Sequence, residues 1–139
     1  MSISLDGNWN FQLLDRADQE PSKRWQSIPV PGLWTMINGE QPFGDKPIYT
    51  NVQMPFDHLP PTVPTDNPTG IYEREFSLSS SWKSKRVVLS IGGFESVAIL
   101  YINGEEVGSS NYHLVKCSSD GRCSASVDDL LRWSQGSSK

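Results

Sequence analysis

The 139-residue sequence lacks the features that mark several large classes of protein. Twelve basic residues stand against sixteen acidic ones, and a net charge of −4 provides no broad basic surface for phosphates, which argues against nucleic-acid binding. The longest strictly apolar run, Val97–Ile102, is far shorter than the ~20 residues that span a bilayer. The N-terminus has neither the basic start nor the apolar core of a secretory signal. We therefore expect no nucleic-acid or membrane partner and a cytoplasmic location.

Residues for metal or nucleophilic chemistry are equally scarce. The only histidines are His58 and His113, and the sequence contains neither a Gly-x-Ser-x-Gly elbow nor a Gly-rich phosphate loop. Cys117 and Cys123 could join His113 at a metal, but a fourth ligand is missing and the spacing is unlike that of zinc sites. We interpret both cysteines as free thiols. The sequence thus predicts no metal and no cofactor in this chain.

Paired carboxylates, which hydrolyse glycosidic bonds, are the remaining catalytic candidates. The pairs are Glu73 with Glu75, Glu105 with Glu106, and Asp128 with Asp129. Adjacent side chains on a strand point to opposite faces, so the last two pairs cannot converge if they are extended. The first pair shares one face, but that face is the solvated one. We therefore predict no catalytic residue in this chain.

Short strands joined by turns dominate the pattern, because ten prolines and eleven glycines disfavour long helices. Alternation of apolar and polar residues predicts half-buried strands. They cover Trp9–Leu13, Tyr72–Leu78 and Val87–Ile91, with a further strand predicted at Ile48–Val52. Arg74 is the one charged residue on the inner face of its strand, and we expect it to reach a carboxylate or the sheet edge. These short strands and turns together predict an all-β fold, a β-sandwich of the jelly-roll type.

Several turns and edges can be placed more closely. Apart from Glu95 and Ser96, Phe94–Ile102 is apolar on both faces, which predicts a central strand that is covered on both sides. Asn103-Gly104 supplies the two positive-φ positions of a type I′ turn and predicts a hairpin. Pro29 and Pro31 confine a strand around Ile28–Val30 to an edge. Proline-rich Pro55–Gly70 predicts an extended loop, and Ser126–Leu131 is typical of a capped helical turn.

Aromatic side chains are a less specific indication of carbohydrate binding, because their faces can stack on the apolar C–H faces of sugars. The candidates are Trp9, Trp25, Trp34, Tyr49, Phe56 and Tyr72. The alternative is that they are core residues, and we favour it for about two-thirds of them because aromatics dominate cores.

Five stretches together form a more specific pattern. They are Ser4–Phe11, Pro31–Trp34, Pro47–Val52 (P-I-Y-T-N-V), Pro64–Tyr72 (P-T-D-N-P-T-G-I-Y) and Val107-Gly108. In these stretches the chain resembles the N-terminal sugar-binding domain of bacterial β-galactosidases, glycoside hydrolase family two. The resemblance covers residues 4–108, about three-quarters of the chain. It implies a galactose-binding-domain-like jelly roll that lends a loop to the rim of the active site.

The resemblance also implies what this chain does not contain. In the family, an immunoglobulin-like domain and a catalytic barrel follow, and the barrel holds both catalytic glutamates and the magnesium ligands. Magnesium and sodium are therefore expected only in an intact parent that hydrolyses terminal β-galactosides such as lactose. Asn67 resembles the family residue that contacts galactose, and its amide suits sugar hydroxyls. The alternative for Asn67 is an Asx turn that binds only local backbone.

The C-terminal part departs from the family pattern. Ser109–Cys117 matches none of it, and Leu131–Ser137 resembles a family run, L-R-W-S-D-G-S, with Gln135 in place of Asp. We interpret residues 1–108 as the sugar-binding sandwich and residues 109–139 as a divergent or truncated tail, so that the sandwich is incomplete at its C-terminus. An altered reading frame, a retained intron or a truncated copy would each produce such a tail.

The sequence is compatible with three functions, each of a different class. The first is a non-catalytic sugar-binding domain of a β-galactosidase, with a galactoside as the ligand of the parent enzyme. The second is a free-standing carbohydrate-binding module. The third is a structural domain that makes oligomer contacts between subunits.

Overall fold

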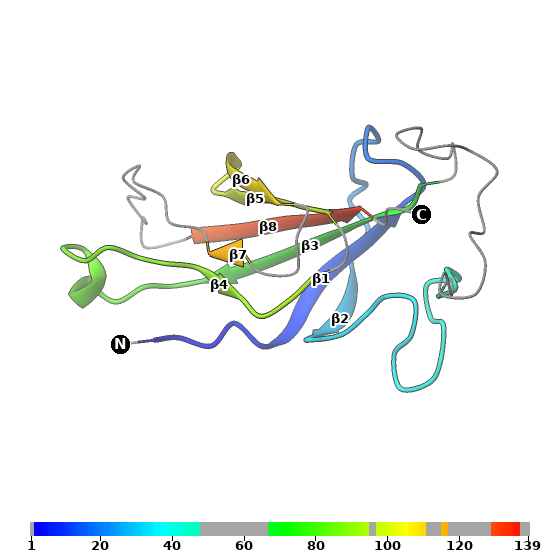
Figure 1. The fold of residues 1–139 in the computed structure, drawn as a ribbon, viewed down its shortest axis with the longest axis horizontal. Helices are drawn as coiled ribbons and strands as arrows, with labels where there is room; N and C mark the ends of the chain where they lie inside the picture. Colours follow the sequence, from blue (N-terminus) through cyan, green and yellow to red (C-terminus); the bar gives the residue numbers. More distant parts are fainter. Residues whose placement is uncertain (1, 48–66, 95–96, 111–114, 117–128, 137–139) are drawn as a thin grey trace.

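The regular structure consists almost entirely of strands (Figure 1). The computed structural model describes residues 2–47, 67–94, 97–110, 115–116 and 129–136. The strands are β1 Gly7–Leu14, β2 Gln26–Val30, β3 Thr69–Phe76, β4 Ser90–Ile91, β5 Val97–Ile102, β6 Glu105–Ser110, β7 Val115–Lys116 and β8 Asp129–Gly136, and a short 3-10 turn covers Ser80–Trp82. Ile48–Val52, predicted as a strand, lies outside the described residues.

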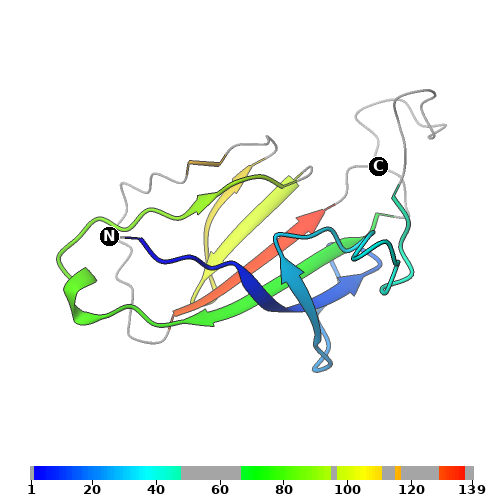
Figure 2. The same ribbon diagram turned by 90° about the horizontal axis from the view of Figure 1, so that it is seen from below.

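Six of the strands form one antiparallel sheet in the order β2-β1-β3-β8-β5-β6, and β4 pairs with β7 in a second, two-stranded sheet. Figure 2 shows the long strands of the large sheet side by side, with the segment that carries β4 running apart from them. Leu89, Ile91 and Phe94 of that segment pack against the apolar face of the large sheet. The all-β sandwich predicted from the sequence is confirmed.

The N-terminal strands follow their apolar pattern. Trp9 and Phe11 of β1 are buried and Leu13 is half-buried, so the predicted alternation is confirmed. β2 pairs only with β1 among the described strands and holds Pro29, which confirms the predicted edge strand. Proline has no N–H to donate, so an edge position costs it no ladder hydrogen bond.

The Asn103-Gly104 hairpin is confirmed. β5 and β6 pair antiparallel from Ile102 opposite Glu105, and φ is +53° at Asn103 and +82° at Gly104. The prediction of a central strand is confirmed, since β5 pairs with both β6 and β8. The predicted cover on both faces is only partial: Ala98 and Leu100 are buried on the core side, whereas on the other face Ile99 and Tyr101 are half-buried and Val97 is 37% exposed.

The proline-rich loop is shorter than predicted. Thr69 and Gly70 were expected in the loop, but both belong to β3, where they pair with β1 on one side and with β8 on the other. Two flanking strands offer hydrogen bonds to both residues, and this tertiary pairing extends the strand past the loop signal. The predicted strand at Val87–Ile91 shows the expected alternation of burial, but its backbone pairs only at Ser90 and Ile91.

The helical turn predicted at Ser126–Leu131 is wrong where the structure describes it. Asp129–Leu131 begin β8, which lies between β3 and β5 and pairs with both. A strand inserted between two open edges satisfies backbone groups on both sides, and this gain exceeds a weak local capping signal. β6 runs through position 108, where the sequence placed the end of the sandwich, and β8 lies entirely after it. The large sheet therefore includes residues from both sides of position 108.

The core lies on one face of the large sheet and is rich in aromatic side chains. Phe11 is fully buried, and its ring centroid lies 4.5 Å from that of Phe43, 4.9 Å from Tyr72 and 6.1 Å from Trp34. Burial raises the pKa of the Tyr72 phenol, which keeps this side chain neutral within the core.

Arg74, the charged residue on the inner face of β3, lies at the opposite end of this core from Gly70. Its Nη1 donates to the backbone oxygens of Asp6 at 3.2 Å and Asn8 at 3.3 Å, and its guanidinium lies 5.9 Å from the Trp9 ring centroid. Neither of the two predicted partners, a carboxylate or the sheet edge, is the one that the structure shows. Arg74 instead bonds backbone carbonyls where β1 begins, because a guanidinium accepts nothing but donates to several oxygens at once.

Candidate functional site

Four strand ends meet at one end of the large sheet. Leu14 at the end of β1 lies opposite Thr69 at the start of β3. Thr69 in turn lies opposite Gly136 at the end of β8, which lies opposite Val97 at the start of β5. The residues that follow β1 and those that precede β3 therefore emerge together. We call this end of the sheet, with Asn67 and the Asp15–Gln19 loop, the Asn67 end.

Asn67 is held in place by the residues that follow it. Pro68 and Thr69 are buried, and the Thr69 hydroxyl donates to the backbone oxygen of Asn67 at 3.4 Å. The residue before a proline is biased to extended backbone, which directs the chain away from the sheet. Asn67 itself is half-buried, and its side-chain oxygen Oδ1 is shielded from solvent without a hydrogen-bond partner among the described residues. An Asx turn from Oδ1 to the N–H of Thr69, the local alternative, is thus not formed.

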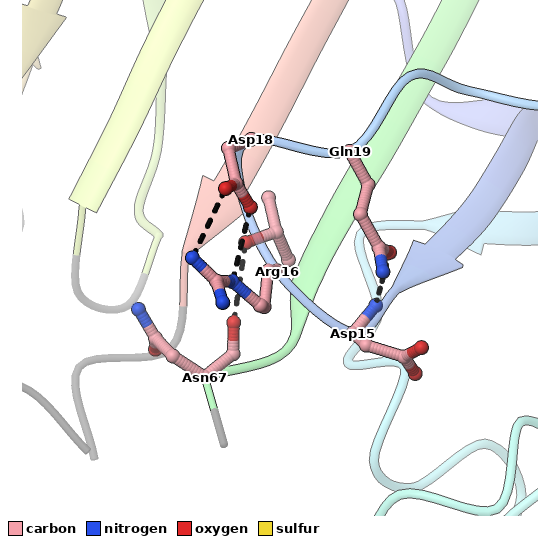
Figure 3. Close-up of polar contacts among 6 residues, drawn as sticks. Asp15, Arg16, Asp18, Gln19 and Asn67 are labelled. Atoms are coloured by element: carbon pink, nitrogen blue, oxygen red, sulfur yellow. Dashed lines mark hydrogen bonds and ion pairs between the residues drawn. The ribbon is translucent and has the colours of Figure 1, made fainter. Parts of the chain in front are cut away.

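The Asp15–Gln19 loop is closed by its own hydrogen bonds (Figure 3). The backbone N–H of Asp15 donates to Gln19 Oε1 at 3.0 Å, and the N–H of Gln19 donates to the Arg16 backbone oxygen at 3.3 Å. The Arg16 guanidinium forms a two-pronged pair with Asp18, with Nε–Oδ1 at 3.1 Å and Nη2–Oδ2 at 3.0 Å. Backbone and side chains together give this loop a defined shape.

Gln12 anchors the chain that returns from this loop. Its side chain is 5% exposed, Nε2 donates to the backbone oxygen of Ser22 at 2.8 Å, and Oε1 accepts from the N–H and the hydroxyl of Ser22 at 2.8 and 3.0 Å. The amide thus pairs with a peptide group as a neighbouring strand would. This pairing holds Ser22 against β1.

Replacing Gln12 with Glu should destabilise the domain by about 2 kcal/mol at neutral pH, because the carboxylate lacks the donor and its charge is buried against the Ser22 carbonyl. Chemical unfolding of the 139-residue chain measures this loss. Gln12→Met is the matched control, because it keeps the shape without the charge. Stability that is equal in the wild type and in Gln12→Glu would show that the Ser22 pairing contributes nothing.

Buried aromatic rings pack against the start of β3, next to the Asn67 end. Gly70 follows Asn67 by three positions, and a Cβ built there would lie 2.8 Å from the Trp34 ring and 2.9 Å from Phe11. Trp34 is 4% exposed, and its indole N–H donates to Asp45 Oδ2 at 2.7 Å. The absence of a side chain at Gly70 lets Trp34 lie directly on β3, which fixes the start of the strand that follows Asn67.

The aromatic candidates for sugar stacking divide as follows. Trp9, Trp34 and Tyr72 are buried in the core, as the alternative interpretation held, and Trp25 is half-buried. Tyr49 and Phe56 lie outside the described residues.

The carboxylate pairs also remain without a catalytic arrangement where the structure describes them. Glu75 is exposed and Glu73 half-buried, and Glu105 and Glu106 are exposed in the β5–β6 hairpin. Asp128 lies outside the described residues. Within those residues, no three or more His, Cys, Asp or Glu side chains gather to hold a metal ion. His58, His113 and both cysteines lie outside the described part of the chain.

Sequence reasoning missed the polar partners of this site. Arg16, Asp18 and Ser22 belong to no motif and to no alternating pattern, and Gln12 was only one position of the predicted strand Trp9–Leu13. The register between β1 and β3 brings Arg16 and Asp18 to the same end of the sheet as Asn67. Among the described helices, none is long and apolar enough to cross a membrane.

Comparison with known proteins finds a family whose model matches nearly the whole chain. The family described as "Glycosyl hydrolases family 2, sugar binding domain" matches residues 3–138. The chain is 36% identical over 148 residues to a β-galactosidase of Psychromonas ingrahamii, 37% over 150 residues to one of Vibrio cholerae, and 36% over 148 residues to one of Kluyveromyces lactis. These alignments cover 96%, 96% and 94% of this chain but 14% of each relative.

Solved structures share the fold at lower identity. A β-glucuronidase from Ruminococcus gnavus matches with a TM-score of 0.65 and 19% identity, over 99% of this chain and 22% of that one. A β-glucuronidase from Faecalibacterium prausnitzii matches with a TM-score of 0.62 and 20% identity, over 95% of this chain and 20% of that one. At this identity the likeness concerns the fold alone.

Proposed function

Because this chain belongs to the sugar-binding-domain family of the glycosyl hydrolases family 2, we propose that it forms one wall of a galactoside-binding pocket in a β-galactosidase. In the proposed parent, retaining hydrolysis of terminal β-galactosides such as lactose takes place in other domains. The domain itself is non-catalytic and spans about 14% of the length of the curated β-galactosidases that it matches. A cytoplasmic location and subunit contacts through this domain remain predictions.

The residue that we assign to the sugar is Asn67. The observation that carries this assignment is its Oδ1 atom, which is shielded yet has no hydrogen-bond partner among the described residues. A shielded acceptor without a donor costs about 1–3 kcal/mol, and a small rotation of the amide toward a ligand hydroxyl would recover that cost. The amide also carries two donors, so one side chain can bind two neighbouring hydroxyls of a galactose ring.

Replacing Asn67 with Ala in the full-length enzyme should lower kcat/KM for β-galactosides by about 10- to 100-fold, as expected for the loss of one or two hydrogen bonds to substrate. Steady-state kinetics with lactose and with nitrophenyl β-galactoside measures this loss. Asn10→Ala is the matched control, because Asn10 is exposed on β1 away from the Asn67 end. Unchanged kinetics in Asn67→Ala would favour a purely structural domain.

Calorimetry on the 139-residue chain separates this proposal from a free-standing carbohydrate-binding module. One wall of a pocket buries little of a sugar, so galactose and lactose should bind only weakly. Sub-millimolar binding by the chain alone would instead identify a complete binding site.

A further inference from the structure

We propose that Arg16 and Asp18 bind the leaving-group sugar of the galactoside, so that the domain favours substrates whose leaving group is a saccharide over those whose leaving group is an aryl alcohol. The inference rests on the proposed function, because it takes Asn67 as the contact to the galactose ring. It adds a second subsite with its own residues and its own substrate class.

The first step is position. Since Leu14 lies opposite Thr69, the loop that leaves β1 and the segment that enters β3 start from neighbouring strands at the same end of the sheet. Figure 3 shows Arg16 and Asp18 on that end together with Asn67, one set from the loop after β1 and the other from the residues before β3. The Asn67 amide and this ion pair thus lie at the same end of the sheet, and the leaving-group side of a galactoside held by Asn67 is the part that the pair would bind.

The second step is chemistry. A guanidinium has five N–H donors, of which Asp18 takes two, and the carboxylate oxygens retain lone pairs after accepting these bonds. Donors and acceptors therefore lie side by side on one rigid unit. A saccharide leaving group presents several hydroxyls, each both donor and acceptor, whereas a nitrophenyl group presents no hydroxyl. The pair can both donate to and accept from saccharide hydroxyls, whereas a nitrophenyl group offers only weak nitro acceptors to Arg16 and no donor to Asp18.

The third step is exposure and order. The side chains of Arg16 and Asp18 are 55% and 67% exposed, so their ion pair contributes little to folding. Their backbone is nevertheless ordered by the closed Asp15–Gln19 turn, which Gln12 ties to β1 through Ser22, and the two side chains orient each other through their two-pronged pair. Groups that are ordered before binding lose less entropy when a ligand arrives. The pair is thus both accessible and preorganised.

The experiment compares two substrates in the full-length enzyme. Arg16→Ala, Asp18→Ala and the double variant should each lower kcat/KM for lactose about fivefold, mainly through KM, because one or two exposed hydrogen bonds are lost. The same variants should leave kcat/KM for nitrophenyl β-galactoside within about twofold, since the aryl group offers no hydroxyls. Lys85→Ala and Glu105→Ala remove exposed charges of the same two signs elsewhere and serve as matched controls.

The outcomes separate the two proposals. If Asn67→Ala weakens both substrates and the Arg16 and Asp18 variants weaken neither, the second subsite is overturned while the proposed function stands. If the Arg16 and Asp18 variants weaken both substrates equally, they act on the shape of the site and leaving-group recognition is overturned. If Asn67→Ala changes nothing, the proposed function fails together with this inference. A selective loss with lactose supports the subsite.

Discussion

A Gly70→Ala substitution should destabilise the domain by about 3 kcal/mol or more, the upper range for overpacking a core. The new methyl group would lie 2.8 Å from two carbons of the Trp34 ring and 2.9 Å from Phe11. These rings cannot retreat easily, because Trp34 is buried and hydrogen-bonded to Asp45. Urea unfolding of the 139-residue chain, followed by tryptophan fluorescence, measures the change.

Gly108→Ala is the matched control for this result. Gly108 also lies in a strand, β6, yet a Cβ built there meets nothing within 4 Å. Alanine in an open strand position loses less entropy on folding than glycine, so this variant should be neutral or slightly more stable. Equal stability of the two variants would mean that the close approach of Trp34 to β3 is not a feature of the folded chain.

Phe11→Ala should cost about 3–5 kcal/mol, the range for removing a fully buried phenylalanine side chain. Phe11 is the most central ring of the core, in contact with Trp34, Phe43 and Tyr72. Its removal leaves a cavity among three aromatic side chains, of which Trp34 and Phe43 come from the loop of residues 32–47 after β2 and Tyr72 from β3. Thermal and urea unfolding monitored by circular dichroism measure the loss.

Phe43→Ala serves as the control for Phe11→Ala. The Phe43 ring packs on Phe11 at 4.5 Å but is only half-buried, so the same truncation exposes less new surface and should cost clearly less. A Phe43→Ala loss equal to that of Phe11→Ala would place the centre of the core in the 32–47 loop instead of in β1.

The strands that could be predicted are those whose burial differs between two faces. In β1, Trp9 and Phe11 alternate with exposed Asn8 and Asn10, and the pattern alone gave the strand and its inner face. β8 could not be predicted in this way, because its position between β3 and β5 follows from pairing partners far away in the chain. Local signals carry periodicity and turn chemistry, but not which edges remain open for a later strand.

The candidate site likewise has one residue that the sequence could indicate and others that it could not. The resemblance singled out Asn67 before its surroundings were known, and the structure places it at a sheet end with its Oδ1 unpartnered among the described residues. Arg16 and Asp18 carried no signal, because a charged pair in a loop looks like ordinary surface until the register of β1 and β3 shows that it shares a sheet end with Asn67. Sequence patterns locate a residue in the chain, whereas the neighbours of a binding residue depend on strand register.

The interior position of β8 has a consequence for synthesis on the ribosome. β3 and β5 are separated by about twenty residues of chain but never touch as partners, since residues 129–136 must come between them. While a nascent chain still lacks this segment, both strands present open edges to other polypeptides. Assembly of the complete large sheet therefore waits until translation has passed residue 136, the last residue of β8.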